Sequence, residues 1–259
     1  MNRIDEKFAS LGEKKALITF VTAGDPDLET TEKLVLSMVD AGVDIIELGV
    51  PFSDPVAEGP IIQDASKRSL DAGTTLVKIF NLVKSMREKT NVPILLMMYL
   101  NSIFGFGTDK FFQLCVECGI DGVIVPDMPF EERDELLSYS QKYGVHSISL
   151  VAPTSKDRIA MIASEAKGFL YCVSSTGVTG TRNSFQTDFN EFMGTIKQHA
   201  KVPCAIGFGI SNPEQAKKMS QYSDGVIVGS AIVRIIEKEK QASVKSVHDF
   251  VKSLKEAIS

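Results

Sequence analysis

Three acidic residues lie close together in one part of the chain, in and just after an apolar run. In the segment IIELGVPFSDPVAEGP, residues 45–60, Glu47 stands inside the run, and Asp54 and Glu58 follow it. An ionised carboxylate is costly to bury unless it is paired or protonated. A buried carboxyl group with a raised pKa is, however, suited to proton transfer near neutral pH. We therefore interpret Glu47 as a candidate proton carrier.

Two of these acids also have a structural interpretation. Glu47 could form a buried ion pair with a basic residue of a neighbouring strand, although few Lys or Arg residues occur at the ends of the other predicted strands. Asp54 lies in the tripeptide Ser-Asp-Pro, which favours the start of a turn. Its role therefore stays open between turn formation and function.

Two glycine-containing segments near the C-terminus favour the binding of an anion. The first, GFGIS, contains Gly207 and Gly209, and the second, VGSAIVRII, places Gly229 and Ser230 at the start of a predicted short helix. Glycines let backbone N–H groups approach a phosphate closely, and the N-terminus of a helix attracts negative charge. Two such segments in adjacent units predict a phosphorylated substrate.

The elements that must position these residues are eight apolar runs that alternate with amphipathic segments. The predicted strands span 16–24, 43–50, 92–99, 121–127, 145–153, 168–174, 202–209 and 224–230. The predicted helices span 27–42, 60–72, 75–89, 109–118, 130–143, 156–166, 188–199, 213–221 and 246–258. Runs that are continuously apolar are typical of parallel strands covered on both faces.

This alternation predicts an α/β protein with one (β/α)8 TIM barrel over residues 1–259, an extra N-terminal helix and a short phosphate-binding helix after strand eight. A doubly wound open sheet is the competing topology, but it seldom needs eight parallel strands, and no GxGxxG follows the first strand. In a barrel the active site lies on the loops after the strands. Tyr99, Asn101 and Asp127 are further polar residues on that rim.

The loop after strand six, SSTGVTGTRNSF, is long and polar and contains Gly177 and Gly180. A surface loop is the simple interpretation, but lids that exclude water from barrel active sites have this position and composition. We favour the lid.

Composition excludes several other classes of protein. The chain of 259 residues is 44% hydrophobic and 24% charged, with a net charge of −5, which argues against a nucleic-acid-binding surface. The longest apolar stretch, 92–100, is too short to span a membrane, and the N-terminus has no apolar signal core, so we expect a cytoplasmic protein. Cys115 and Cys118 form a CxxC on a predicted helix, and we expect them to be buried there rather than to bind metal.

Five segments carry a resemblance to a known family. FVTAGDPD, IIELGVPFSDPVAEGP, SSTGVTGTRN, GFGIS and VGSAIV resemble, in this order, the motifs of the tryptophan synthase alpha chain family. The resemblance covers the whole chain and implies a TIM-barrel lyase that cleaves indole-3-glycerol phosphate to indole and glyceraldehyde 3-phosphate. It implies no metal or organic cofactor, no nucleic-acid or membrane partner, and assembly with a tryptophan synthase beta chain as an α2β2 heterotetramer.

The resemblance also implies roles for individual positions. The catalytic residues are Glu47 and Glu58. The substrate-binding positions, including those that hold the lid, are Phe20, Tyr99, Asp127, Tyr171, Thr179, Gly180, Phe208, Gly209, Gly229 and Ser230. The positions at the interface with the beta chain are Pro51, Asp54, Asn101 and Pro129. The family motif DPLADGP has Asp where this chain has Glu58, so the second acid is one methylene longer here.

Two alternative functions stay open at this point. One is another phosphate-binding barrel, such as a histidine-pathway isomerase or a phosphosugar aldolase, although a Schiff-base aldolase would need a Lys at a strand end and none lies in the eight predicted strands. The other is a barrel of low activity that acts mainly as an activator of a beta chain, which the departure at Glu58 favours.

Overall fold

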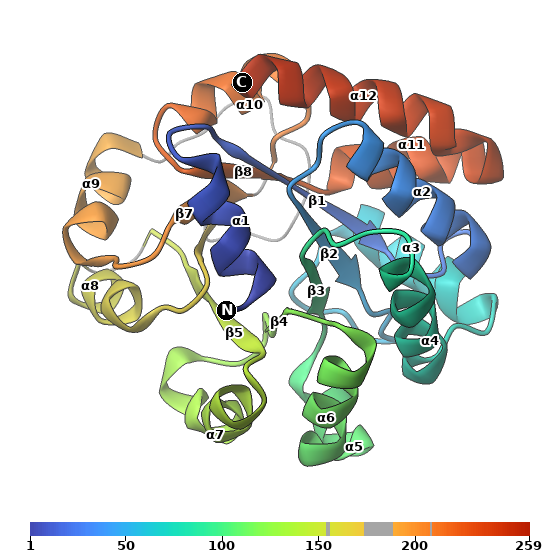
Figure 1. Cartoon of the computed structure of the whole chain (residues 1–259), viewed down its shortest axis with the longest axis horizontal. Helices are drawn as coiled ribbons and strands as arrows, with labels where there is room; N and C mark the ends of the chain where they lie inside the picture. The colour runs from blue at the N-terminus through green and yellow to red at the C-terminus, as the bar shows by residue number, and fades with distance from the viewer. Residues whose placement is uncertain (154–155, 174–188, 208) are drawn as a thin grey trace.

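The computed structural model describes residues 1–153, 156–173, 189–207 and 209–259. Its strands form a closed barrel in which β1 to β8 pair in chain order and β8 pairs with β1, all parallel (Figure 1). The strands are β1 Ala16–Thr22, β2 Ile45–Gly49, β3 Ile94–Met97, β4 Gly122–Ile124, β5 His146–Val151, β6 Leu170–Val173, β7 Cys204–Gly207 and β8 Gly225–Val228. The predicted (β/α)8 barrel is confirmed.

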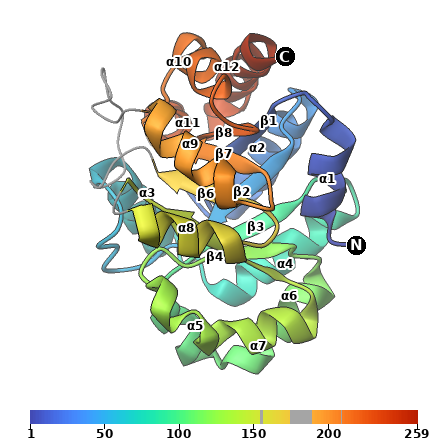
Figure 2. The ribbon, with the colours of Figure 1, turned by 90° about the vertical axis from the view of Figure 1, so that its left-hand side faces the viewer.

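Helices surround the barrel, and one closes its base. They are α1 Arg3–Leu11, α2 Leu28–Asp40, α3 Pro60–Asp71, α4 Leu76–Arg87, α5 Leu100–Phe106, α6 Thr108–Cys118, η1 Phe130–Glu132, α7 Asp134–Tyr143, α8 Lys156–Glu165, α9 Phe189–His199, α10 Pro213–Ser220, α11 Ser230–Glu239, η2 Lys240–Ala242 and α12 Ser243–Ile258. Figure 2 shows α8 and α9 side by side, with α7 apart from them.

The strands are apolar throughout because both of their faces are covered. In β1 all seven residues are buried. Leu17 and Val21 pack against the helices, whereas Ala16 and Ile18 belong to the cluster inside the barrel. Apolar side chains on both faces therefore stabilise the sheet, and period-two alternation is absent, as the sequence indicates.

Helix α1 closes the N-terminal end of the barrel. The side chain of Asn2 accepts a hydrogen bond from the N–H of Ile4 at 2.9 Å and donates one to the carbonyl of Asp121 at 2.8 Å. Ile4 and Phe8 pack into the interior cluster. Because this end is filled by α1, a substrate reaches the barrel interior from the opposite, C-terminal end of the strands.

Some elements differ from the prediction. The strands are shorter than expected, and α5 lies between the predicted strand 92–99 and the predicted helix 109–118, where the sequence predicts no helix. The first N–H of α5, that of Leu100, donates to the carboxylate of Asp127 at 3.0 Å, so an acid from the loop after β4 caps the helix. The cysteines of the CxxC, Cys115 and Cys118, are buried free thiols on α6, as predicted. Among the described residues, no helix is long and apolar enough to cross a membrane.

Candidate active site

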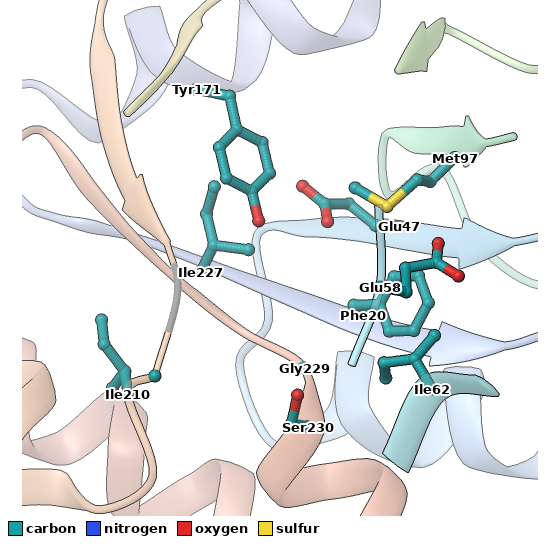
Figure 3. Close-up of a pocket in the computed structure, with 11 residues that line it drawn as sticks. Phe20, Glu47, Glu58, Ile62, Met97, Tyr171, Ile210, Ile227, Gly229 and Ser230 are labelled. Carbon is teal, nitrogen blue, oxygen red and sulfur yellow. The ribbon is translucent and has the colours of Figure 1, made fainter. Parts of the chain in front are cut away.

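A pocket opens at the C-terminal ends of the strands (Figure 3). It is lined by Phe20, Glu47, Glu58, Ile62, Met97, Tyr171, Gly209, Ile210, Ile227, Gly229 and Ser230. The described residues in this lining include two carboxyl groups and no Lys, Arg or His side chain. The structure thus brings together seven of the positions that were expected to form the site, and it adds four apolar ones.

Glu47 lies deeper in the barrel than a strand-end position. It is the third of five residues in β2, in register with Phe20 on β1 and Leu95 on β3. The next inward-facing residue of β2 is Gly49, which has no side chain. The Glu47 side chain is therefore the last that β2 directs toward the pocket. Neither oxygen of the fully buried Glu47 carboxyl has a hydrogen-bond partner among the described residues. Burial raises its pKa to about 8.

The absence of a side chain at Gly49 gives space to Phe20. A Cβ atom at residue 49 would lie 2.5 Å from Cζ of the Phe20 ring, which is far inside van der Waals contact. The Phe20 ring therefore lies across Gly49. A Cβ atom at residue 229 would in turn lie 3.2 Å from the Cβ of Phe20. Two glycines, one at the end of β2 and one between β8 and α11, thus allow one aromatic wall of the pocket.

Glu58 is the second acid of the pocket and comes from the loop between β2 and α3. It is 8% exposed, and burial raises the pKa of its carboxyl group to about 7. The backbone around it is held by two side chains. The N–H of Ala57 donates to the Tyr99 hydroxyl at 2.9 Å, and Gln63 Nε2 donates to the Glu58 carbonyl at 2.8 Å. The Tyr99 ring also stacks on Phe52, with ring centroids 4.8 Å apart.

Tyr171, which belongs to β6, lies across the pocket from the two acids. Its hydroxyl points toward the Glu47 carboxyl in Figure 3. Burial, and to a smaller extent the charge of Glu47, holds the pKa of the Tyr171 hydroxyl well above its ordinary value. Tyr171 is therefore a neutral hydrogen-bond donor at any pH near neutrality.

The remaining side of the pocket is suited to an anion. Gly209 has a φ of +88°, a conformation that other residues rarely adopt. Gly229 precedes α11, and Ser230 is the first residue of that ten-residue helix. The first N–H groups of a helix have no partner within the helix and carry partial positive charge. In Figure 3 the hydroxyl of Ser230 faces the same space.

The other predicted positions lie around this pocket or outside the described residues. The Tyr99 hydroxyl accepts a hydrogen bond from the loop that carries Glu58, and Asp127 caps α5. Neither residue lines the pocket itself. Pro51 is buried, whereas Asp54, Asn101 and Pro129 are exposed on the loops and on α5 at the barrel mouth. Thr179, Gly180 and Phe208 lie outside the described residues, as does the expected lid loop.

Sequence reasoning missed Ile62, Met97, Ile210 and Ile227 as lining residues. Apolar residues in or next to strands and helices look like core in a sequence. Strand register places Met97 and Ile227 at the pocket, and the packing of α3 and of the loop after β7 places Ile62 and Ile210 there. In the part of the chain that the structure describes, no group of three or more His, Cys, Asp and Glu residues could hold a metal ion.

A closed parallel barrel with two buried acids and a helix N-terminus at its C-terminal mouth defines an enzyme of the (β/α)8-barrel class. The model of the family described as tryptophan synthase alpha chain matches residues 8–259. The chain belongs to this family.

Individual relatives are similar to the chain over almost their full lengths. The chain is 53% identical to the tryptophan synthase alpha chain of Thermoanaerobacter sp. (strain X514) over 262 residues, which cover 100% of both proteins. Its structure is similar to that of tryptophan synthase subunit alpha from Legionella pneumophila str. Paris, with a TM-score of 0.89, 38% identity and coverage of 100% and 98%. A chain of Mycobacterium tuberculosis tryptophan synthase gives a TM-score of 0.91, 30% identity and coverage of 99% and 98%.

Proposed function

We propose that this chain is an indole-3-glycerol-phosphate lyase, which cleaves its substrate to indole and glyceraldehyde 3-phosphate. The observation that carries the proposal is the presence of Glu47 and Glu58, two desolvated carboxyl groups, in one pocket whose described lining has no cationic side chain. Each part of the substrate also has a corresponding part of the pocket. The apolar walls correspond to the indole ring, the acids to the reacting atoms of the ring and the glycerol chain, and the anion-binding end to the phosphate.

Glu47 is the proton carrier of the proposed reaction. With a pKa of about 8, its carboxyl group is mostly protonated at neutral pH and gives its proton to C3 of the indole ring. The resulting carboxylate takes the proton of the glycerol hydroxyl next to the ring while the bond between C3 and the side chain breaks. The aldehyde forms, the bond electrons return to the ring, and Glu47 is protonated again.

Glu58 acts on the nitrogen of the indole ring. Protonation at C3 makes this nitrogen cationic, and a carboxylate that accepts its N–H hydrogen bond stabilises the charge. With a pKa of about 7, Glu58 is about half ionised at neutral pH in the empty site, and the developing cation favours its ionised form. The two acids thus have different pKa values and different roles.

The remaining lining residues bind and orient the substrate. Gly209, Gly229, Ser230 and the N-terminus of α11 would hold the phosphate through N–H groups and the helix dipole. Phe20, Ile62, Met97 and Ile227 supply apolar surface for the indole ring. No step of this mechanism needs a metal ion or an organic cofactor, because both proton transfers run through Glu47.

The proposal includes a tryptophan synthase beta chain as partner, in an α2β2 assembly in the cytoplasm. The expected interface positions Asp54, Asn101 and Pro129 are exposed around the barrel mouth. Two large apolar side chains lie exposed near them in the same segments, Val56 at 69% and Phe104 at 45%. An apolar surface around the exit for indole is suited to a partner that receives this product.

The test is indole release from indole-3-glycerol phosphate by the purified chain, alone and with a beta chain. We expect activity that rises when the beta chain is added. The second candidate, an activator barrel with little chemistry of its own, rests on the Glu58 departure from the family motif. It predicts stimulation of the beta chain's own reaction together with no indole release in either condition, and that result would reject the lyase.

A further inference from the structure

A second cavity, of about 460 Å³, lies between α7 and α8 and extends to the barrel mouth, where Ala57, Leu150 and Val173 also line it. Helix α7 packs against α6 and α8 packs against α9, but the cavity separates α7 from α8, with β5 between them (Figure 1). Its lining shares no residue with the pocket that contains Glu47 and Glu58. The two pockets therefore have separate linings.

The floor of this cavity is polar where the two adjacent strands present apolar side chains to their helices. Ser147 and Ser149 are the outward-facing residues of β5, because the intervening Ile148 belongs to the interior cluster. Their register partners on the adjacent strands, Val123 and Leu170, are fully buried under helices. Neither serine hydroxyl forms a hydrogen bond with a described residue, so both are available to a ligand.

Both helices contribute apolar side chains to the lining, Leu137 from α7 and Ile162 from α8. Phe130 from η1 adds an aromatic side chain at one end, and the guanidinium of Arg133 lies over its ring at 3.8 Å. A polar floor between apolar walls is the composition of small-molecule sites, which combine apolar area with a few placed polar groups.

Two ion pairs cross the mouth of the cavity. Arg133, next to η1, pairs with Glu165 at the end of α8, and Arg158 of α8 pairs with Glu131 of η1. Each carboxylate is thus held by a guanidinium from the opposite side. Exposed pairs of this kind contribute little net stability, so their rearrangement around a ligand costs little.

A third cation is left over. Lys167 lines the cavity at its far end, and among the described residues it has no ion-pair partner. Arg133 pairs with Asp134 as well as with Glu165, and Arg158 pairs with Glu131, so Lys167 is the cation of the described lining that no carboxylate neutralises. A ligand with one negative charge would pair with Lys167, whereas a cationic ligand would be repelled by it.

We propose that the cavity between α7 and α8 binds a small organic carboxylate with an apolar body. The carboxylate would pair with Lys167 and reach Arg158, the body would lie between Leu137 and Ile162, and the hydroxyls of Ser147 and Ser149 would hydrogen-bond to polar atoms of the ligand. The pocket that contains Glu47 and Glu58 would also bind an indole ring, so the test counts only the binding that substitutions in this cavity remove.

The test uses four probes with the same ring and different head groups. They are indole-3-acetate, L-tryptophan, tryptamine and indole, and because the chain contains no Trp, their fluorescence is seen without a protein background. We expect indole-3-acetate to bind, and Lys167→Ala and Ser149→Phe each to weaken this binding at least tenfold. Lys167→Arg restores it, and Lys142→Ala on α7, which breaks an exposed pair with Asp109 of α6, leaves it unchanged.

Other outcomes of the binding experiment would change or overturn the proposal. Tighter binding of L-tryptophan than of indole-3-acetate would mean that Glu165 or Glu131 receives an ammonium group, and would replace the proposed class by amino acids. The proposal would be overturned if tryptamine or indole bound equally well in the component that Ser149→Phe removes, or if neither Lys167→Ala nor Ser149→Phe weakened any part of the indole-3-acetate binding. The two substitutions act through charge and volume separately, and the surface change Lys167→Ala serves if Ser149→Phe does not fold.

Discussion

The ring of Tyr171 lies against Gly207, so that a Cβ atom at residue 207 would be 2.7 Å from both Cε1 and the hydroxyl oxygen of Tyr171. The two residues come from adjacent strands, β6 and β7. The missing side chain leaves space for the ring in the orientation in which its hydroxyl faces Glu47 (Figure 3). Gly207 thus sets the position of a residue in the active site without lining the pocket itself.

Gly207→Ala should displace the Tyr171 ring and lower the kcat of indole release at least tenfold, about 1.4 kcal/mol in barrier. The displacement depends on the size of residue 171. In a Tyr171→Leu background, therefore, the same Gly207→Ala change should cost much less, and a double-mutant cycle measures the difference. Equal costs in the two backgrounds would show that the contact does not position the ring.

Glu47 makes stability depend on pH. Its pKa is raised from 4.5 to about 8 in the folded chain. Below pH 4.5 the group is protonated in both states and has no effect, whereas between 4.5 and 8 the unfolded chain releases the proton and the folded chain keeps it. The free energy of unfolding therefore falls as pH rises through this range, by roughly 5 kcal/mol at most, and stays lower above it.

Glu47→Gln removes this dependence. We expect urea unfolding of the variant and the parent to give similar stability near pH 4, and the variant to be the more stable of the two by several kcal/mol at pH 8 and above. Glu58, whose pKa is raised as well, is present in both proteins and does not contribute to the difference. A constant offset at all pH values would mean that the buried carboxyl group does not titrate as described.

Tyr99→Phe removes the hydroxyl that accepts the N–H of Ala57, the residue before Glu58. We expect a stability loss of about 1 kcal/mol, the net contribution of a hydrogen bond, and a larger proportional loss of kcat than of substrate affinity. Tyr139→Phe on α7 removes a hydroxyl far from the pocket and is the matched control. Unchanged kcat in Tyr99→Phe would show that the Glu58 loop is held without this bond.

Glu58→Asp restores the residue of the family motif. We expect lyase activity equal to or above that of the parent, because the shorter acid returns the carboxylate to the family geometry. A loss of tenfold or more would instead mean that the pocket is built around the longer side chain. Steady-state kinetics of indole release with the two proteins decides between these results.

The barrel could be predicted from the sequence because its cause is local. Strands buried on both faces give continuous apolar runs, and in β1 every residue from Ala16 to Thr22 is buried. Helix α5 could not be predicted in the same way. The residue that caps it, Asp127, follows 27 positions after Leu100, and a helix start that depends on such a distant acid leaves no local signal.

The candidate site was predicted in part for a similar reason. The acids Glu47 and Glu58 stand out because carboxylates are rare in apolar surroundings, and Gly229 and Ser230 stand out at the start of a helix. Met97 and Ile227 look like any core residue, and their place at the pocket follows from strand register alone. The depth of Glu47, two residues before the end of β2, is also a result of register.

The proton-carrying role of Glu47 is the central claim, and one measurement tests it most directly. Indole release from indole-3-glycerol phosphate is compared between the parent and Glu47→Gln, each with a beta chain, after circular dichroism has established that both are folded. The amide cannot exchange a proton with C3 or with the glycerol hydroxyl, so we predict a loss of at least about a thousandfold, near 4 kcal/mol in barrier. Turnover within tenfold of the parent would contradict the account.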